Sequence, residues 1–136
     1  MLEPGSGGRD TVVAVLVVDD QAPFRDAARM VLALSDGFEL AGEAETGQQS
    51  VELATTLRPD LVLMDINLPD IDGFEATRRI RDVSPRPPIV VMLSTYEAVD
   101  YADRAIDAGA AAFVSKSTFT PDELQRVWDE ASAQIG

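Results

Sequence analysis

One aspartate, Asp65, stands at a point of the chain where a strand would deliver a carboxylate to a loop. It follows Leu61–Met64, an apolar run of the length and type found in strands buried on both faces. The segment Leu68–Gly73 then turns the chain with Pro and Gly before a helical pattern begins. A carboxylate in this position can act as a nucleophile, although an isolated one is more often a solvated strand end. The groups at the other strand ends therefore decide the interpretation.

Other apolar runs also end in polar groups that would serve such a reaction: Val12–Val18 is followed by Asp19 and Asp20, Ile89–Leu93 by Ser94, and Ala111–Val114 by Ser115 and Lys116. Each group alone has an ordinary explanation, as a charged turn, a helix N-cap or a solvated side chain. Together they are the parts of a phosphoryl-transfer site, in which an acid is the nucleophile, cations neutralise the phosphoryl oxygens and a hydroxyl bonds one of them. Crowded carboxylates also favour a hard divalent cation such as Mg²⁺.

These groups meet only if the strands end at one edge of one sheet. Apolar runs alternate with helical patterns, which predicts strands over residues 12–18, 38–44, 61–64, 89–93 and 111–114 and helices over residues 23–35, 47–57, 74–82, 97–108 and 121–135. The alternation predicts an α/β fold: a doubly wound, flavodoxin-like, five-stranded parallel sheet of order 2-1-3-4-5 with five helices. Ligands bind beyond the carboxyl ends of such strands, where the strand order reverses. That point lies between the strands that lead to Asp19 and Asp65.

The length and composition exclude several classes of function. The 136 residues suit one domain, predicted over residues 11–136 after a loose N-terminal tail at residues 1–10. Twenty-four acidic residues against 11 basic ones give a net charge of −13, which argues against a nucleic-acid partner for this chain alone. The absence of histidine and cysteine removes histidine-based catalysis and disulfides and fits a cytoplasmic protein. No apolar run approaches the length of a membrane span, so no membrane association is expected.

The combination of motifs resembles the receiver domain of bacterial two-component response regulators over residues 11–135, through Asp19, Asp20, Asp65, Ser94, Lys116 and the segment Leu68–Gly73. The resemblance implies that Asp65 is a phosphoacceptor, which takes a phosphoryl group from a sensor histidine kinase or a phosphotransfer protein in a Mg²⁺-dependent step. It implies no enzymatic activity beyond weak self-catalysed phosphotransfer and dephosphorylation. The expected output is a changed surface, formed by the strand at residues 89–93, the helix at residues 97–108 and the strand at residues 111–114, that binds a partner protein or a second copy of the chain. Tyr96 and Tyr101 are candidate contact residues on this surface.

The resemblance also assigns the remaining site residues, which fall into three groups: the Mg²⁺ ligands Asp19, Asp20, Asp65 and the backbone carbonyl of Asn67, the phosphoryl-binding residues Ser94 and Lys116, and the switch residues Ser94 and Phe113. Ser117 departs from the family pattern, because many receivers have Pro there in a cis peptide bond. A cis bond to a non-proline residue costs about 2.5–4 kcal/mol. The sequence therefore leaves the Lys116–Ser117 bond open as cis or trans.

Rival interpretations make different demands on the sequence. A phosphatase of the haloacid-dehalogenase type needs a second Asp two residues after the first, where this chain has Asn67. A flavodoxin needs a Ser/Thr/Gly-rich phosphate loop after the first strand, where this chain has Asp19 and Asp20. The alternative that remains is a receiver fold that acts only as a phosphorylation-independent protein-binding module. The sequence also leaves open whether the chain is a single-domain regulator or the receiver of a longer protein.

Overall fold

A computed structural model of the protein describes residues 12–95 and 99–135, so the predicted tail at residues 1–10 lies outside the described residues. The strands are β2 (Val13–Val18), β3 (Phe38–Ala44), β4 (Leu61–Asp65), β5 (Ile89–Ser94) and β6 (Ala112–Ser115). The helices are α1 (Ala22–Ala33), α2 (Gly47–Leu57), α3 (Gly73–Val83), α4 (Val99–Ala108) and α5 (Pro121–Ile135), with a short 3₁₀ helix, η2 (Lys116–Thr118). The elements alternate as the sequence predicts.

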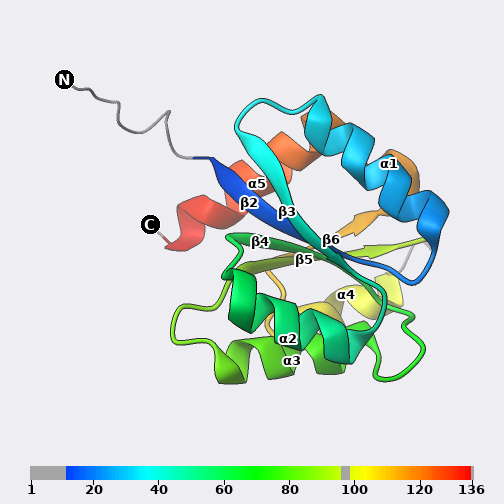
Figure 1. The fold of residues 1–136 in the computed structure, drawn as a ribbon, viewed down its shortest axis with the longest axis vertical. Coiled ribbons are helices and arrows are strands. Elements are labelled where there is room, and N and C mark those ends of the chain that lie inside the picture. The colour runs from blue at the N-terminus through cyan, green and yellow to red at the C-terminus, as the bar shows by residue number, and fades with distance from the viewer. Residues whose placement is uncertain (1–11, 96–98, 136) are drawn as a thin grey trace.

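The strands form one parallel five-stranded sheet of order β3-β2-β4-β5-β6, which confirms the predicted order 2-1-3-4-5. Helices α1 and α5 cover one face of the sheet and α2, α3 and α4 cover the other (Figure 1). In the centre β2 pairs with β4, and Val18 lies opposite Met64. The residues that follow these two positions, Asp19 and Asp65, therefore leave the sheet side by side.

The sheet separates two apolar clusters, one under each helix layer. Leu63 belongs to the cluster under α1 and α5, with Leu32 and Leu124. Met64, the next residue, belongs to the cluster under α2, α3 and α4, with Phe74. Because alternate side chains point to opposite faces, a strand covered on both sides must be apolar throughout until it reaches the edge. This burial fixes the register of β4 and thereby the position of its last residue, Asp65.

Two details differ from the pattern-based prediction. The first helix is shorter, because α1 ends at Ala33 and Gly37, with a φ of 86°, belongs to the turn that enters β3. The sequence pattern also predicts Ile106 on the buried face of α4, but its side chain is 64% exposed. Ala105 and Ala108 are buried instead. They lie about one helical turn apart, whereas Ile106 is rotated away from their face.

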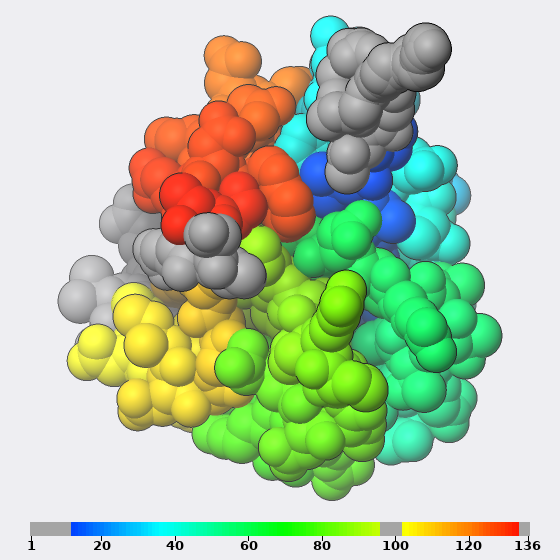
Figure 2. All heavy atoms as spheres, turned by 90° about the vertical axis from the view of Figure 1, so that its left-hand side faces the viewer, coloured from blue at the N-terminus to red at the C-terminus, as the bar shows by residue number. Residues whose placement is uncertain are grey.

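Helices α4 and α5 lie on the same side of the molecule (Figure 2). Figure 2 looks onto the edge at which the strands begin, and there α5 (orange to red) lies on the same side as α4 (yellow). Between them β6 is the edge strand of the sheet, and it packs against α4. Among the helices that the structure describes, none combines the length and the apolar composition needed to cross a bilayer.

Candidate functional site

The carboxyl edge of the sheet holds a cluster of acidic side chains. Asp19 follows β2 directly, Asp20 comes next, and Asp65 is the last residue of β4. One carboxylate oxygen from each lies within 4.8 Å of the others. Asp19 is fully buried and Asp65 is 6% exposed, while Asp20 is exposed to solvent. The structure therefore brings together the three acids that the sequence predicts as metal ligands.

Lys116 joins this cluster from the edge strand. It follows β6, and its Nζ lies 2.5 Å from Oδ2 of Asp19 and 3.2 Å from Oδ1 of Asp65. The ammonium also lies 4.5 Å from the ring centroid of Phe24, at the start of α1, in a cation–π contact. Only 10% of the lysine side chain is exposed. A buried ammonium held between two carboxylates is a structural component of the site and not a solvated side chain.

The electrostatics of the cluster favour an additional cation. Burial, and after it the charge of Asp19, raises the pKa of Asp65 from 3.8 to about 6. Lys116 opposes this shift, and Asp20 adds a smaller increase. When all groups are ionised, three carboxylates and one ammonium leave a net charge of −2. Hard oxygen ligands with a net charge of −2 match a divalent ion such as Mg²⁺. The residues present therefore fit the metal that the sequence predicts.

Hydrogen bonds hold Asp19 in this position. Its Oδ1 accepts a hydrogen bond from the backbone N–H of Gln21, at 2.8 Å. Its backbone carbonyl accepts another from Nη1 of Arg25, at 2.7 Å, and Nε of Arg25 lies 3.3 Å from Oε1 of Glu43. Sequence reasoning missed Arg25 and Phe24. The sequence does offer one signal for them. Both residues lie in the first turns of the helix that follows Asp19, and in a parallel sheet such a helix begins at the carboxyl edge, beside the site.

The other predicted site residues lie on β5, on β6 and in the loop after β4. Ser94 ends β5, lies opposite Ser115 of β6 and is 2% exposed. Phe113 lies in β6, partly buried against the cluster of apolar residues under α4. Asn67 lies two residues after Asp65 and is exposed. Contact residues were also predicted at two tyrosines, but Tyr96 and the side chain of Tyr101 lie outside the described residues.

The peptide bond between Lys116 and Ser117 is trans, since no cis peptide bond occurs in the described part of the chain. The chain continues from Lys116 as η2, in which the backbone N–H of Ser117 donates to Oγ of Ser115 at 3.2 Å. The two serine hydroxyls lie 2.8 Å apart. This turn holds Lys116 in the cluster without a proline, which resolves the question that Ser117 raises in the sequence.

The start of α3 is in direct contact with the backbone of Asp65. A Cβ placed on Gly73 would lie 2.1 Å from the carbonyl oxygen of Asp65. The backbone N–H of Gly73 donates to the carbonyl of Ile66 at 2.8 Å, and Asp72 caps the helix by accepting a hydrogen bond from the N–H of Glu75 at 2.8 Å. Gly73 is therefore required by space, because any side chain here would displace either α3 or the carboxyl end of β4.

The sequence profile described as "Response regulator receiver domain" matches residues 15–128. The chain belongs to this family. The receiver domain is 41% identical over 104 residues, or 76% of its length, to a protein-glutamate methylesterase/protein-glutamine glutaminase from Alkalilimnicola ehrlichii, of which it covers 27%. It is 36% identical over 117 residues, or 85% of its length, to the response regulator GacA from Pseudomonas viridiflava, of which it covers 54%.

Solved structures agree with the fold. The response regulator domain of CheB from Thermotoga maritima superposes with a TM-score of 0.80 at 29% sequence identity, covering 89% of this chain and 97% of that one. The chain spans about half or less of the length of the two curated relatives named above. The portion of these relatives that matches is their receiver portion.

Proposed function

We propose that this receiver accepts a phosphoryl group on Asp65 from the phosphohistidine of a sensor histidine kinase or a phosphotransfer protein, in a Mg²⁺-dependent step. The observation that carries the proposal is the cluster itself: three carboxylates within 4.8 Å of one another, with the Lys116 ammonium at 3.2 Å from Asp65. An ion pair with Lys116 needs only one acid, and the remaining two negative charges favour binding of a divalent cation.

The chain's own residues have distinct tasks in this reaction. An oxygen of the ionised Asp65 attacks phosphorus, a P–O bond forms, and the P–N bond of the donor breaks with its electron pair leaving on the histidine nitrogen. Lys116 stabilises the negative charge on the phosphoryl oxygens, and the hydroxyl of Ser94 donates a hydrogen bond to one of them. Asp19, Asp20, Asp65 and the backbone carbonyl of Asn67 would hold Mg²⁺, which supplies charge neutralisation at the phosphoryl group when bound.

The test is phosphorylation by acetyl phosphate with Mg²⁺ or with EDTA, with the modified residue located by mass spectrometry. We expect Mg²⁺-dependent addition of one phosphoryl group to Asp65, and none in Asp65→Asn, which keeps the shape of the side chain but removes the nucleophile. Asp36→Asn is the matched control, since Asp36 is an exposed acid in the turn between α1 and β3. Labelling of Ser94, or labelling that persists in Asp65→Asn, would contradict the assignment.

We further propose that phosphorylation changes the surface formed by β5, α4 and β6 and its binding to a partner protein or to a second copy of the chain. Support comes from the packing there: the buried face of α4 uses small side chains, Ala105 and Ala108, so little apolar area holds this helix in place. Ser94 lies next to β6, and Phe113 of that strand is only partly buried. A hydroxyl drawn toward the phosphoryl group leaves space that the Phe113 ring can fill.

Hydrogen exchange of the protein with and without beryllofluoride and Mg²⁺ tests this second proposal. We expect changes in exchange rate to centre on residues 94–116, because this segment contains the hydroxyl, the weakly packed helix and the edge strand. Helices α1 and α2 serve as internal references. Changes confined to those two helices would contradict a switch at the α4 side of the molecule.

A further inference from the structure

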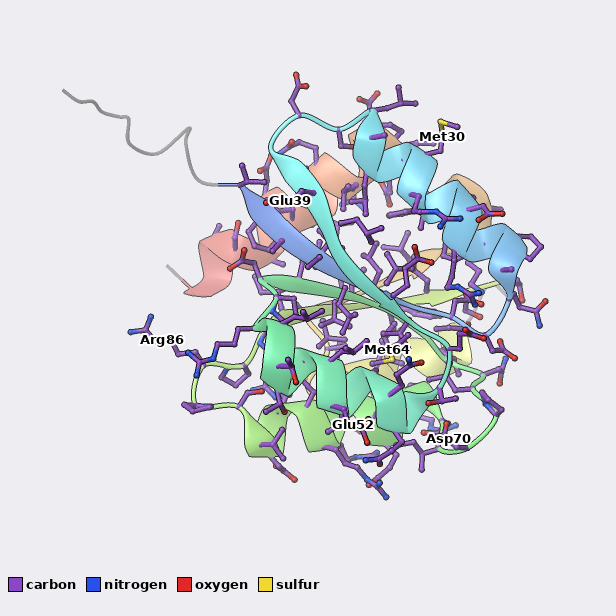
Figure 3. All side chains as sticks on the ribbon, viewed as in Figure 1. Met30, Glu39, Glu52, Met64, Asp70 and Arg86 are labelled. Carbon is purple, nitrogen blue, oxygen red and sulfur yellow. The ribbon has the colours of Figure 1, made fainter. Side chains whose placement is uncertain are left out.

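The loop between β4 and α3, residues 66–72, is attached to the rest of the molecule at two points. At its base, the backbone N–H of Gly73 donates to the carbonyl of Ile66 at 2.8 Å. Near its far end, Asp70 reaches the start of α2 (Figure 3). Oδ1 of Asp70 accepts a hydrogen bond from the backbone N–H of Gly47, and Oδ2 accepts one from Gln48, both at 2.8 Å. One side chain therefore connects the loop after the phosphoacceptor to a helix 22 residues away in sequence.

The chemistry of this attachment is favourable. The first N–H groups of a helix have no acceptor within the helix, and its N-terminus attracts negative charge. Desolvation opposes ionisation of Asp70, but the hydrogen bonds from Gln48 and Gly47 lower its pKa below the ordinary value. The local cap of α2, Thr46, accepts from a different donor, the N–H of Gln49, at 3.0 Å. Asp70 and Thr46 therefore bind separate N–H groups and do not replace one another.

Close packing supports the same contact. Gly47 is buried, and a Cβ placed on it would lie 2.4 Å from Cγ1 of Ile71 and 2.9 Å from the Ile71 carbonyl oxygen. The backbone of the loop therefore lies directly against the first residue of α2. The helix α2 is itself packed on the sheet through the buried Ala54. The position of the loop relative to the sheet is therefore held by its contacts with this helix as well as by its own two ends.

We propose that Asp70 is a positioning residue for the Mg²⁺ site: its two hydrogen bonds to α2 hold the loop after β4, and with it the backbone carbonyl of Asn67, in the position from which that carbonyl would complete the metal site. Three of the oxygen ligands come from Asp19, Asp20 and Asp65, at or beside the ends of buried strands, whereas Asn67 lies in the loop, between its two attachment points. Its carbonyl is therefore the ligand whose position depends on the loop. The inference rests on the proposed function, because it concerns the same metal site.

The experiment compares Mg²⁺ binding by isothermal titration calorimetry in the wild type, Asp70→Ala and Thr46→Ala. Loss of an outer residue that orients a metal ligand typically weakens affinity about tenfold or more, and we expect a rise in the Mg²⁺ dissociation constant of that order for Asp70→Ala. Thr46→Ala is the matched control, since it removes a cap from the same helix without touching the loop. We expect it to lower the melting temperature while leaving the dissociation constant unchanged.

Two further measurements separate positioning from stability. Asp70→Asn keeps one acceptor oxygen, so its dissociation constant should fall between those of the wild type and Asp70→Ala. In metal-free Asp70→Ala, the amides of Gly47 and Gln48 should exchange faster than in the wild type. If Asp70→Ala and Thr46→Ala bind Mg²⁺ equally well, the inference is wrong and the proposed function stands. If the wild type itself binds no Mg²⁺ at millimolar concentration, both are wrong.

Discussion

Asp65→Asn is expected to raise the free energy of unfolding of the metal-free protein at pH 7.5, by up to about 3 kcal/mol. The pKa of Asp65 rises from 3.8 in the unfolded chain to about 6 in the fold, through burial and the charge of Asp19. Each unit of such a shift corresponds to about 1.4 kcal/mol. Above pH 6 the folded protein must hold an ionised carboxylate that prefers to be protonated, and Asn removes that cost.

The sign of the pH dependence follows from the same shift. The folded state binds a proton more tightly than the unfolded state, so the stabilisation from protonated Asp65 is complete below pH 3.8 and is lost as the pH rises through about 6. The difference between wild type and Asp65→Asn, measured by urea denaturation in EDTA, should therefore shrink between pH 7.5 and pH 5. Equal free energies of unfolding at pH 7.5 would contradict this prediction, because they would show that ionised Asp65 does not destabilise the metal-free fold.

Mg²⁺ should reverse the order of the two proteins. A ligand that binds only the folded state stabilises it by an amount that grows with concentration over the dissociation constant. The wild type has all three carboxylates and is stabilised fully by bound Mg²⁺. Asp65→Asn has lost one charged ligand, so Mg²⁺ should stabilise its folded state less. The buried charge at Asp65 is thus a cost to the metal-free fold that the bound cation would relieve.

Much of this site was accessible from sequence, because its strongest signals are local. Asp19 and Asp65 each end an apolar run, and the fold follows from the alternation of such runs with helical patterns. A parallel sheet then brings strand ends together without further information, so the meeting of these acids with Lys116 was predictable. The same logic fixed the order of the strands.

What the sequence could not supply depends on contacts between distant segments. Nothing in the local pattern around Asp70 distinguishes a solvated turn acid from one that binds the N–H groups of Gly47 and Gln48. The contact of Phe24 with Lys116 likewise depends on where the first turn of α1 meets the turn after β6. On α4, a weak apolar pattern of small residues did not determine the helix rotation, and Ile106 proved to be exposed.

Gly73→Ala should be among the most destabilising small substitutions in the described chain. The added Cβ would lie 2.1 Å from the carbonyl oxygen and 3.0 Å from the carbonyl carbon of Asp65, and 2.9 Å from Cε of Met92. The methionine tip can move, but the backbone of a central strand cannot move without breaking its pairing with both neighbours. Overpacking of this kind typically costs about 1–3 kcal/mol, and we expect a loss of about 3 kcal/mol in the free energy of unfolding.

Because the clash is with Asp65 itself, the substitution should also weaken Mg²⁺ binding, which loss of helix stability alone would not do. Gly42→Ala is the matched control: its Cβ would lie 2.7 Å from Cδ1 of Leu57, the end of a flexible side chain that is 37% exposed and able to rotate away. Urea denaturation and calorimetric Mg²⁺ titration of both variants would measure the two effects. Gly42→Ala should retain the wild-type affinity for Mg²⁺. If Gly73→Ala retains it as well, α3 does not hold the phosphoacceptor in place, and the absence of a side chain at this position serves only the packing of the helix.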